Sequence, residues 1–276
     1  MENGSIAHMK IKRVSINKMT DSDDELAVEE PLEIILLYGG SSQPIQKSIS
    51  VTMRTPGCDQ ELAVGFLFTE GIIQSRGQVM EAQSMPFTEN RIRVELGTNV
   101  NPVLQKSERN FYTTSSCGVC GKSSIDAIRT VSVYKNEPDE IRVGASVFYG
   151  LQVELRKQQA VFESTGGLHA SALFDLDGNF GMLREDVGRH NALDKVIGAA
   201  FLNDQLPLDD KILLLSGRAS FELVQKALMA GIKIVASVGA PSSLAVQLAL
   251  ESGITLIGFL RNERFNIYSA EQRVVV

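Results

Sequence analysis

The chain has only three cysteines in 276 residues, too few for a disulfide scaffold in a protein of this length. Residues 1–20 lack the apolar core of a signal peptide, and no later apolar run approaches the length of a membrane span. These absences predict a cytoplasmic protein with reduced thiols and no membrane partner.

Basic residues are in deficit, because 27 Lys and Arg stand against 33 Asp and Glu and the formal net charge is −6. Binding to nucleic acid or to an anionic membrane depends on clustered Lys and Arg, so the balance argues against both partners. The signatures GxGxxG and GxxxxGK[ST] are absent, which removes the main support for a Rossmann or P-loop nucleotide site.

The composition that is present is ordinary for a globular protein, with 43% hydrophobic and 22% charged residues, and it predicts two subdomains. An N-terminal segment, 1–30, is expected to be partly exposed, with a strand-like run followed by acidic residues. A small α+β roll of the β-grasp type is predicted over residues 31–110. Its elements are strands at 33–38, 45–53 and 91–96 and a helix at 59–73, with Asp59 as N-cap.

The second half of the chain predicts an α/β domain over residues 125–276. Apolar strands alternate with helices that open on serine and close on glycine, which favours a largely parallel sheet with both faces covered. The predicted strands are 168–174, 211–215, 232–238 and 254–260, and the predicted helices are 125–131, 146–162, 191–201, 220–230 and 242–251.

Two of the three cysteines, Cys117 and Cys120, lie in a polar stretch at 113–124 of small, hydroxylated and glycine residues. Such a composition predicts a mobile CxxC loop, assigned to residues 111–124. A zinc site would need further ligands, and the candidates Cys58, His169 and His190 are scattered.

Three other interpretations of the CxxC pair remain. A thioredoxin-like pair would follow an apolar strand, whereas this pair follows polar residues, and a purely structural loop would leave two thiols without a use. Nucleophilic sulfur chemistry, by thiolate or persulfide, is the leading interpretation, because nearby Lys122 and backbone N–H groups would lower the thiol pKa. A second thiol two residues away could resolve a persulfide.

Polar residues follow three predicted strands, at 216–218, 239–243 and 261–264. The carboxyl ends of parallel strands meet at one edge, near helix N-termini, and arginine suits bidentate phosphate contacts. Arg261 and Arg264 therefore predict a phosphate or nucleotide-like ligand at this edge. The alternative is that these loops only cap helices.

Residues 184–195 form the densest charged cluster. His190 and Asp194 are four residues apart and would share a helix face, which suggests an oriented imidazole. An ion-paired surface or interdomain network is the alternative. His169 lies within an apolar strand, where a hydrogen-bonded core histidine is the more common outcome.

Taken together, these motifs resemble the formate dehydrogenase accessory sulfurtransferase family, FdhD/NarQ. The resemblance rests on these stretches in chain order: 116–121 (SCGVCG), 165–170 (TGGLHA), 184–195 (REDVGRHNALDK), 216–218 (SGR), 240–243 (APSS) and 258–268. It implies a cytoplasmic sulfur carrier that takes sulfur from a cysteine desulfurase. The acceptor would be a molybdenum or tungsten bis(molybdopterin guanine dinucleotide) cofactor, before its insertion into formate dehydrogenase.

The resemblance also implies site residues and an assembly. Cys117 would carry the persulfide, Cys120 would assist, and the protein would be a homodimer with a cytidine-deaminase-like three-layer α/β core. The single CxxC pair, without a complementary pair of ligands, predicts in addition that the protein binds no zinc. The cofactor segment would be Phe259, Leu260, Arg261, Asn262, Glu263 and Arg264, with Ser216, Gly217 and Arg218 as less certain members.

Two other functions are weighed against sulfur transfer. The residues that deaminase chemistry requires are missing from this sequence. Ser171 stands at the position of the general-base glutamate, and no PCxxC motif follows. A cofactor-binding chaperone, in which the CxxC pair only grips a partner, remains the alternative.

Overall fold

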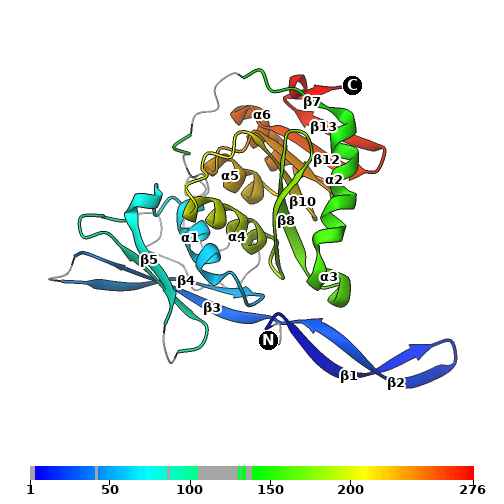
Figure 1. The fold of residues 1–276 in the computed structure, drawn as a ribbon, viewed down its shortest axis with the longest axis horizontal. Coiled ribbons are helices and arrows are strands. Elements are labelled where there is room, and N and C mark those ends of the chain that lie inside the picture. The colour runs from blue at the N-terminus through cyan, green and yellow to red at the C-terminus, as the bar shows by residue number, and fades with distance from the viewer. Residues whose placement is uncertain (1–3, 41–42, 86–87, 105–129, 131, 135–138) are drawn as a thin grey trace.

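The computed structural model describes residues 4–40, 43–85, 88–104, 130, 132–134 and 139–276. Figure 1 shows a body in which a small sheet and its helix adjoin a larger helix-covered sheet, with a long hairpin extending from the body. The strands are β1 (Ile6–Ser15), β2 (Lys18–Ala27), β3 (Glu30–Tyr38), β4 (Ile45–Arg54), β5 (Val79–Ser84), β6 (Arg91–Leu96), β7 (Val143–Gly144), β8 (His169–Asp175), β9 (Phe180–Asp186), β10 (Lys211–Leu215), β11 (Ile234–Ser237), β12 (Thr255–Arg261), β13 (Arg264–Ser269) and β14 (Val274–Val275). The helices are α1 (Asp59–Thr69), α2 (Ala145–Gln158), α3 (Ala160–Thr165), α4 (Arg189–Leu202), α5 (Phe221–Met229) and α6 (Ser243–Ser252), with short 3₁₀ turns at Arg76–Gln78 and Glu271–Arg273.

The predicted α+β roll is a four-stranded sheet in the order β4-β3-β6-β5, in which β3 and β6 run parallel. Strand β5 was not predicted. Helix α1 starts one residue earlier than an Asp59 N-cap would imply: its N-cap is Cys58, in the left-handed region at φ 56°, so the prediction of Asp59 as N-cap is wrong. Asp59 instead accepts two hydrogen bonds from the buried Arg54 guanidinium, at 3.0 and 3.1 Å, and this holds the helix start against β4.

The α/β prediction is correct, but the sheet is mixed and not largely parallel. Its order is β13-β12-β11-β10-β8-β9, and only the pairs β10–β11 and β11–β12 are parallel. Strands β8, β9 and β13 join by antiparallel pairing. The error arose because β9, which ends in charged residues, and β13, which begins with one, were not recognised as strands. The prediction therefore gave β8 no hairpin partner.

The larger sheet separates two apolar layers, because its strands alternate the faces of successive side chains. Leu213 and Leu215 of β10 face a cluster shared with α4, α5 and α6, whereas Ile212 and Leu214 face a cluster shared with α2. Both faces are therefore covered, as the long apolar strands predicted. The long helix predicted over 146–162 is interrupted at Gln159, which separates α2 from α3.

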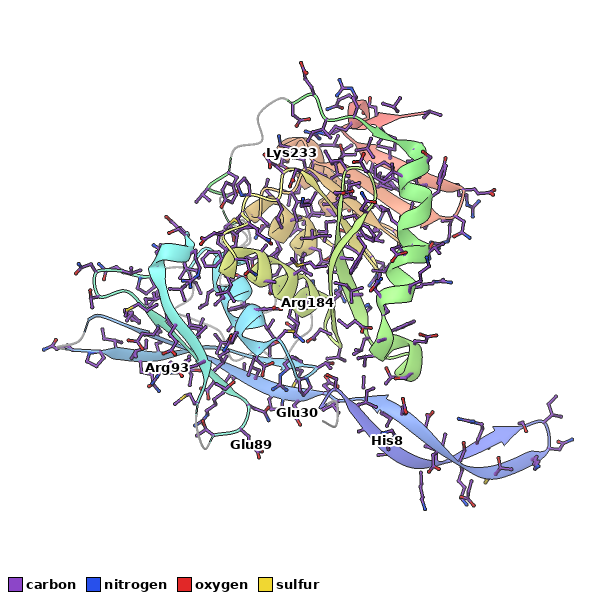
Figure 2. All side chains as sticks on the ribbon, in the orientation of Figure 1. His8, Glu30, Glu89, Arg93, Arg184 and Lys233 are labelled. Atoms are coloured by element: carbon purple, nitrogen blue, oxygen red, sulfur yellow. The ribbon has the colours of Figure 1, made fainter. Side chains whose placement is uncertain are left out.

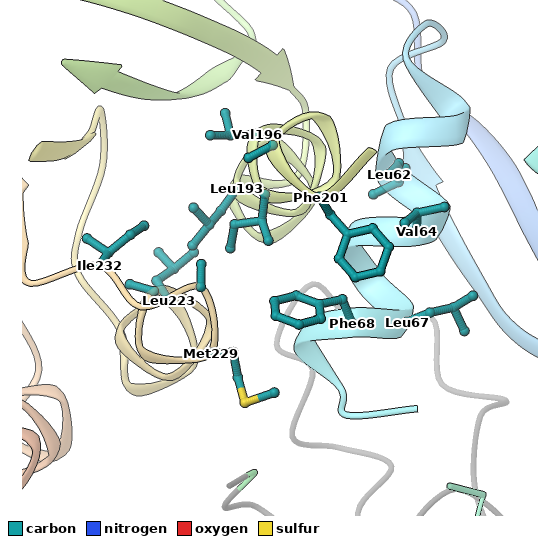
Figure 3. Packing of buried hydrophobic residues seen from close by; sticks show 14 of the residues in the cluster. Leu62, Val64, Leu67, Phe68, Leu193, Val196, Phe201, Leu223, Met229 and Ile232 are labelled. Carbon is teal, nitrogen blue, oxygen red and sulfur yellow. The ribbon is translucent and has the colours of Figure 1, made fainter. Parts of the chain in front are cut away.

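Helices α1 and α4 join the roll to the larger sheet through one continuous core (Figure 3). A Cβ on Gly65 would lie 1.9 Å from the Asp194 carbonyl oxygen, and one on Gly198 would lie 1.8 Å from that of Glu61. Only glycine permits this backbone approach. Beside it the rings of Phe68 and Phe201 pack at a tilt of 47° with centroids 5.2 Å apart, so the two subdomains share a packed interface.

Strands β1 and β2 form a separate two-stranded antiparallel ladder at the N-terminus. The run expected near residues 9–16 is β1, and most of the acidic segment expected to be exposed is β2. Asn17 adopts φ 57° at the turn, a conformation that tight hairpin turns require and asparagine tolerates. The helix predicted over 125–131 lies outside the described residues apart from Thr130.

Candidate functional site

The site is built from the carboxyl edge of the six-stranded sheet, since the CxxC loop lies outside the described residues. Cys117 and Cys120, and with them the loop assigned to 111–124, are therefore untested predictions. The third cysteine, Cys58, lies at the N-cap of α1 with part of its surface exposed to solvent. Partial desolvation of the thiol and the nearby Glu61 carboxylate raise the pKa of Cys58. A raised pKa makes Cys58 a poor nucleophile.

Backbone hydrogen bonds continue past the ends of β10, β11 and β12 and bring two predicted segments together. The Gly239 N–H donates to the Gly217 carbonyl at 2.9 Å, and the Phe259 N–H donates to the Gly239 carbonyl at 3.0 Å. A Cβ on Gly239 would lie 2.9 Å from the Gly217 oxygen and 3.0 Å from Arg218 Cα. The glycines therefore let three loops stack backbone to backbone, and the turn at 216–218 reaches the segment at 259–264.

Phe259 has an unusual backbone at this edge. Its φ of 52° lies in the left-handed region, and it sits in the irregular register of β12 between Gly258 and Arg261. The Phe259 side chain is 43% exposed. An exposed aromatic face next to backbone amides is suited to stacking a flat base.

Arg261 is fixed by the neighbouring strand end. Its Nη1 donates to the carbonyl oxygens of Val238 and Leu260, both at 2.7 Å. Carbonyls orient the guanidinium without cancelling its charge, so the remaining donors can bind an anion. Arg261 is thus the best-positioned cation of the predicted segment.

The rest of the predicted segment is a hairpin and not an open loop. Arg261 ends β12, Arg264 starts β13 as its cross-strand partner, and Asn262 and Glu263 form the turn. Leu260 is fully buried in the core, so its side chain does not reach a ligand at this edge. Glu263 adds a negative charge beside the two arginines.

Serine residues occupy the N-cap positions of two helices at this edge, but their hydroxyls have different partners. Ser242 is the N-cap of α6, and its hydroxyl accepts a hydrogen bond from the Ala245 N–H at 3.2 Å, as the capping interpretation predicted. Ser220 is the N-cap of α5, but its hydroxyl lies 3.4 Å from His190 Nε2. Of these two hydroxyls, only that of Ser242 therefore caps its helix.

His169 is half-buried at the first position of β8, which runs antiparallel to β10 and so begins at the same edge. A Cβ on Gly217 would lie 3.4 Å from the His169 Nδ1, so the imidazole adjoins the 216–218 turn. Burial, with a contribution from Arg189, lowers the pKa of His169 below its ordinary value. The prediction of a core histidine is wrong: the reversed direction of β8 places it at the site.

His190 and Asp194 have separate partners. His190 Nε2 lies 3.2 Å from a Glu222 carboxylate oxygen, while Asp194 is buried against Lys226, at 2.9 Å, and Thr69. The predicted orientation of the imidazole by Asp194 is therefore wrong. Glu222, in the first turn of α5, was missed, and the only sequence signal for it was its position after the Ser220 cap.

Three further charged residues of the 184–195 cluster, Arg184, Asp186 and Lys195, fasten the two subdomains, as the interdomain alternative predicted. Arg184 forms an ion pair with Glu61 of α1, with Nη2 and Oε1 2.8 Å apart (Figure 2). Lys195 Nζ lies 2.7 Å from Asp186 and donates to the Thr55 carbonyl at 2.9 Å. The ion pairs and hydrogen bonds of these side chains therefore stabilise the fold.

Metal ligands and membrane spans were sought in the same part of the chain. Among the described residues, no three or more His, Cys, Asp or Glu side chains gather as metal ligands. No helix within those residues is long and apolar enough to cross a membrane.

The model of the FdhD/NarQ family matches residues 27–275. The chain is 47% identical over 278 residues to the sulfur carrier protein FdhD of Mycobacterium bovis, covering 97% of this chain and 98% of the relative. It is 40% identical to the sulfur carrier protein FdhD of Sulfolobus acidocaldarius, covering 96% and 99%. A solved structure described as a formate dehydrogenase accessory protein of Desulfotalea psychrophila matches with a TM-score of 0.77 at 24% identity, covering 98% of this chain and 100% of that one.

Proposed function

This chain belongs to the FdhD/NarQ family, and we propose from that premise that it is a sulfur carrier with an accessory role for formate dehydrogenase. It receives sulfur from a cysteine desulfurase as a persulfide on Cys117 and transfers it to a molybdenum or tungsten bis(molybdopterin guanine dinucleotide) substrate. The protein acts as a homodimer in the cytoplasm. Formate dehydrogenase receives the sulfurated cofactor.

Sulfur loading is a thiol exchange. The Cys117 thiolate attacks the outer sulfur of the desulfurase persulfide, a new S–S bond forms on Cys117, and the desulfurase thiolate leaves. Cys120 then attacks the inner sulfur, which expels the outer sulfur as hydrosulfide for the cofactor and leaves a Cys117–Cys120 disulfide. A thiol reductant supplies two electrons to reopen this disulfide, and Cys117 returns to a thiolate.

The observation that carries the cofactor assignment is the convergence of the 216–218 turn and the 259–264 segment at one sheet edge. The exposed Phe259 ring suits a guanine base, and Arg261, held by neutral carbonyls, suits a phosphate. Arg218 and Arg264 are exposed in these two segments. Leu260 contributes to the core, so it supports the segment without touching the ligand.

The finer fold and domain assignments are also proposals. The order β4-β3-β6-β5, with parallel central strands and one covering helix, supports a β-grasp-like roll. Helices on both faces of the mixed sheet support a three-layer, cytidine-deaminase-like core. The boundaries 1–30, 31–110, 111–124 and 125–276 follow from these assignments.

Intact-protein mass spectrometry after incubation with a cysteine desulfurase and cysteine tests the carrier function. The parent chain is expected to gain one dithiothreitol-labile sulfur, Cys117→Ala to gain none, and Cys120→Ala to keep loading. Cys58→Ala is the matched control, because it removes the third thiol from an exposed position. Sulfur uptake by Cys117→Ala equal to the parent's would show that the Cys117 assignment is wrong. A parent chain that gains no sulfur would favour a binding chaperone instead, and about one zinc per chain in elemental analysis would favour a structural CxxC site.

A further inference from the structure

His169 is a basic group at the carboxyl edge that the proposed sulfur chemistry leaves unused. It is the first residue of β8 and is half-buried. Successive side chains of a strand alternate between the two faces of a sheet, and Leu173 of the same strand packs in the cluster shared with α4 and α5. His169 lies four residues earlier, so its imidazole is on the same face as these two helices.

Arg189 begins α4 next to this imidazole. Strand β9 pairs with β8 so that Asp186 is opposite His169, and the chain enters α4 three residues after Asp186. Helix α4 packs along β8 (Figure 1). Burial lowers the pKa of His169 and the nearby Arg189 guanidinium lowers it further, so the two basic groups are close enough to repel each other. We name His169 and Arg189 the basic pair.

The carboxylates around the basic pair are occupied by other donors. Asp186 is fully buried, where it lies 2.7 Å from Lys195 and accepts hydrogen bonds from two backbone N–H groups. Glu222 pairs with His190 at 3.2 Å. Within the described residues, no carboxylate forms an ion pair with either member of the basic pair. Two half-buried basic groups without a carboxylate of their own favour an anion from outside the chain.

Backbone groups beside the basic pair add further donors. The glycine turn after β10 reaches the imidazole, since a Cβ on Gly217 would lie 3.4 Å from His169 Nδ1. The Ser216 hydroxyl accepts a hydrogen bond from the Ala170 N–H at 2.8 Å, which ties this turn to β8. Gly188, the N-cap of α4, has no side chain to accept hydrogen bonds from the first N–H groups of the helix. Such N–H groups suit an anion that the basic pair attracts.

The basic pair lies in line with the proposed cofactor segment, because the strand order across the edge is β12-β11-β10-β8. Arg261 of β12 donates to the Val238 carbonyl, so its guanidinium reaches the end of β11. Strands β11 and β8 are two strand spacings apart, about 10 Å. A diphosphate with charge-assisted hydrogen bonds of about 2.8 Å at each end bridges such a gap more readily than a single phosphate.

We propose that the basic pair binds the β-phosphate of the guanosine diphosphate group of the substrate, while Arg261 binds the α-phosphate and Phe259 the base. The assignment rests on the proposed function and gives the substrate a direction across the sheet edge. Its guanine end lies at β12, and its pterin end points toward β8. The negative charge of the β-phosphate offsets the repulsion between the two members of the basic pair.

Calorimetric titration of the full chain with guanosine, GMP and GDP tests this assignment. Arg189→Gln is expected to lower the GDP affinity about ten- to a hundredfold and to leave the guanosine and GMP affinities within about threefold, because only GDP carries a β-phosphate. His169→Gln and Arg189→Lys are each expected to lower the GDP affinity about three- to tenfold, since lysine keeps the charge but not the planar fork. Arg261→Ala should weaken GMP and GDP alike.

The matched control is Arg156→Gln, which removes an exposed arginine from α2, on the other face of the sheet. It should leave all three affinities unchanged. Unchanged GDP affinity in both Arg189→Gln and His169→Gln overturns the proposal. Equal losses for GMP and GDP in Arg189→Gln overturn it as well, since they assign Arg189 to the α-phosphate or, if guanosine is lost equally, to the fold.

Failure of the proposed function gives a different result. A parent chain that binds none of the three ligands removes the cofactor site and the β-phosphate assignment together. A parent chain whose GDP affinity depends on Arg261 but not on the basic pair keeps the cofactor site and loses only the β-phosphate assignment. Sulfur loading on Cys117 is measured separately by mass spectrometry.

Discussion

The two edges of the six-stranded sheet hold basic residues in opposite ways. At the amino edge, Lys233 and Arg273 both contact Asp139, at 3.1 and 2.9 Å, and Arg273 also donates to the Gly253 carbonyl. At the carboxyl edge, Arg261 donates to backbone carbonyls. Within the described residues, no carboxylate forms an ion pair with Arg218, Arg261 or Arg264.

The difference separates structural cations from cations that are free to bind a ligand. A guanidinium paired with a buried carboxylate stabilises the fold, and the carboxylate offsets the positive potential that would attract an anion. A guanidinium held by neutral carbonyls keeps its charge and its orientation. Basic residues at both edges are equally visible in the sequence, and only their partners assign them different roles.

The largest effect is expected at the amino edge. Arg273 is 4% exposed, so Arg273→Met leaves the Asp139 carboxylate and the Gly253 carbonyl without this donor, and the free energy of unfolding should fall by about 3–5 kcal/mol. Urea unfolding measures the loss, and calorimetric titration should show unchanged GDP affinity. A loss of GDP affinity in a folded variant would contradict the division between the edges.

The converse result is expected at the carboxyl edge. Arg261→Ala removes a charge-assisted phosphate contact, so affinity for GDP or the cofactor should fall about ten- to a hundredfold, with a change in unfolding free energy below about 1 kcal/mol. Arg264→Ala should act in the same direction. Lys211→Ala, which removes an exposed cation paired with Asp210, is the control and should leave affinity unchanged. Unchanged affinity in both arginine variants would remove the site.

Titration of Asp139 at the amino edge should contribute to the pH dependence of the unfolding free energy. Hydrogen bonds from Arg273 and Lys233 lower the pKa of Asp139 well below its ordinary range, so the unfolded chain takes up the proton first as pH falls. Stability should therefore decline below about pH 4, with a slope of up to about 1.4 kcal/mol per pH unit from this group. Unfolding curves of Asp139→Asn should be flatter over that range, and an unaltered slope would show that Asp139 is not the responsible group.

The smallest effect is expected at the carboxyl edge. Burial lowers the pKa of His169, so the unfolded state binds this proton more readily and stability should fall as pH drops from about 6.5. The effect should stay below about 1 kcal/mol because the imidazole is only half-buried. His169→Asn should remove the decline and His8→Asn, at an exposed position on the hairpin, should preserve it; the reverse pattern would place the titrating group elsewhere.

Local chemistry was enough to predict many elements. Lys211–Leu215 is a strand with the predicted bounds, because five residues with a continuous apolar run admit little else. Helix α6 begins after the Ser242 cap and ends at Gly253, whose φ of 66° suits glycine. The glycine and arginine residues of the carboxyl edge were likewise predicted as a site from their positions after strand ends.

Long-range contacts decided what the pattern missed. Strand β9 ends in Arg184, Glu185 and Asp186, which read as a solvated segment, but Glu61 and Lys195 from other elements pair with two of them and N–H groups of α3 bind Glu185. Sequence periodicity records only whether a residue is apolar, and it cannot show which distant group will satisfy a charge.

The sequence by itself determined the α/β class, most helices and strands, the family motifs and the candidate edge, because caps, turns and apolar runs act over a few residues. Only the tertiary structure decided the direction of β8, which carries His169 to the Gly217 turn, and the pairing of His190 with Glu222. It also decided that Arg261 donates to neutral carbonyls while Arg273 forms an ion pair with Asp139. Each of these depends on contacts between segments distant in the chain, where burial and the identity of the partner set the role of a charged group.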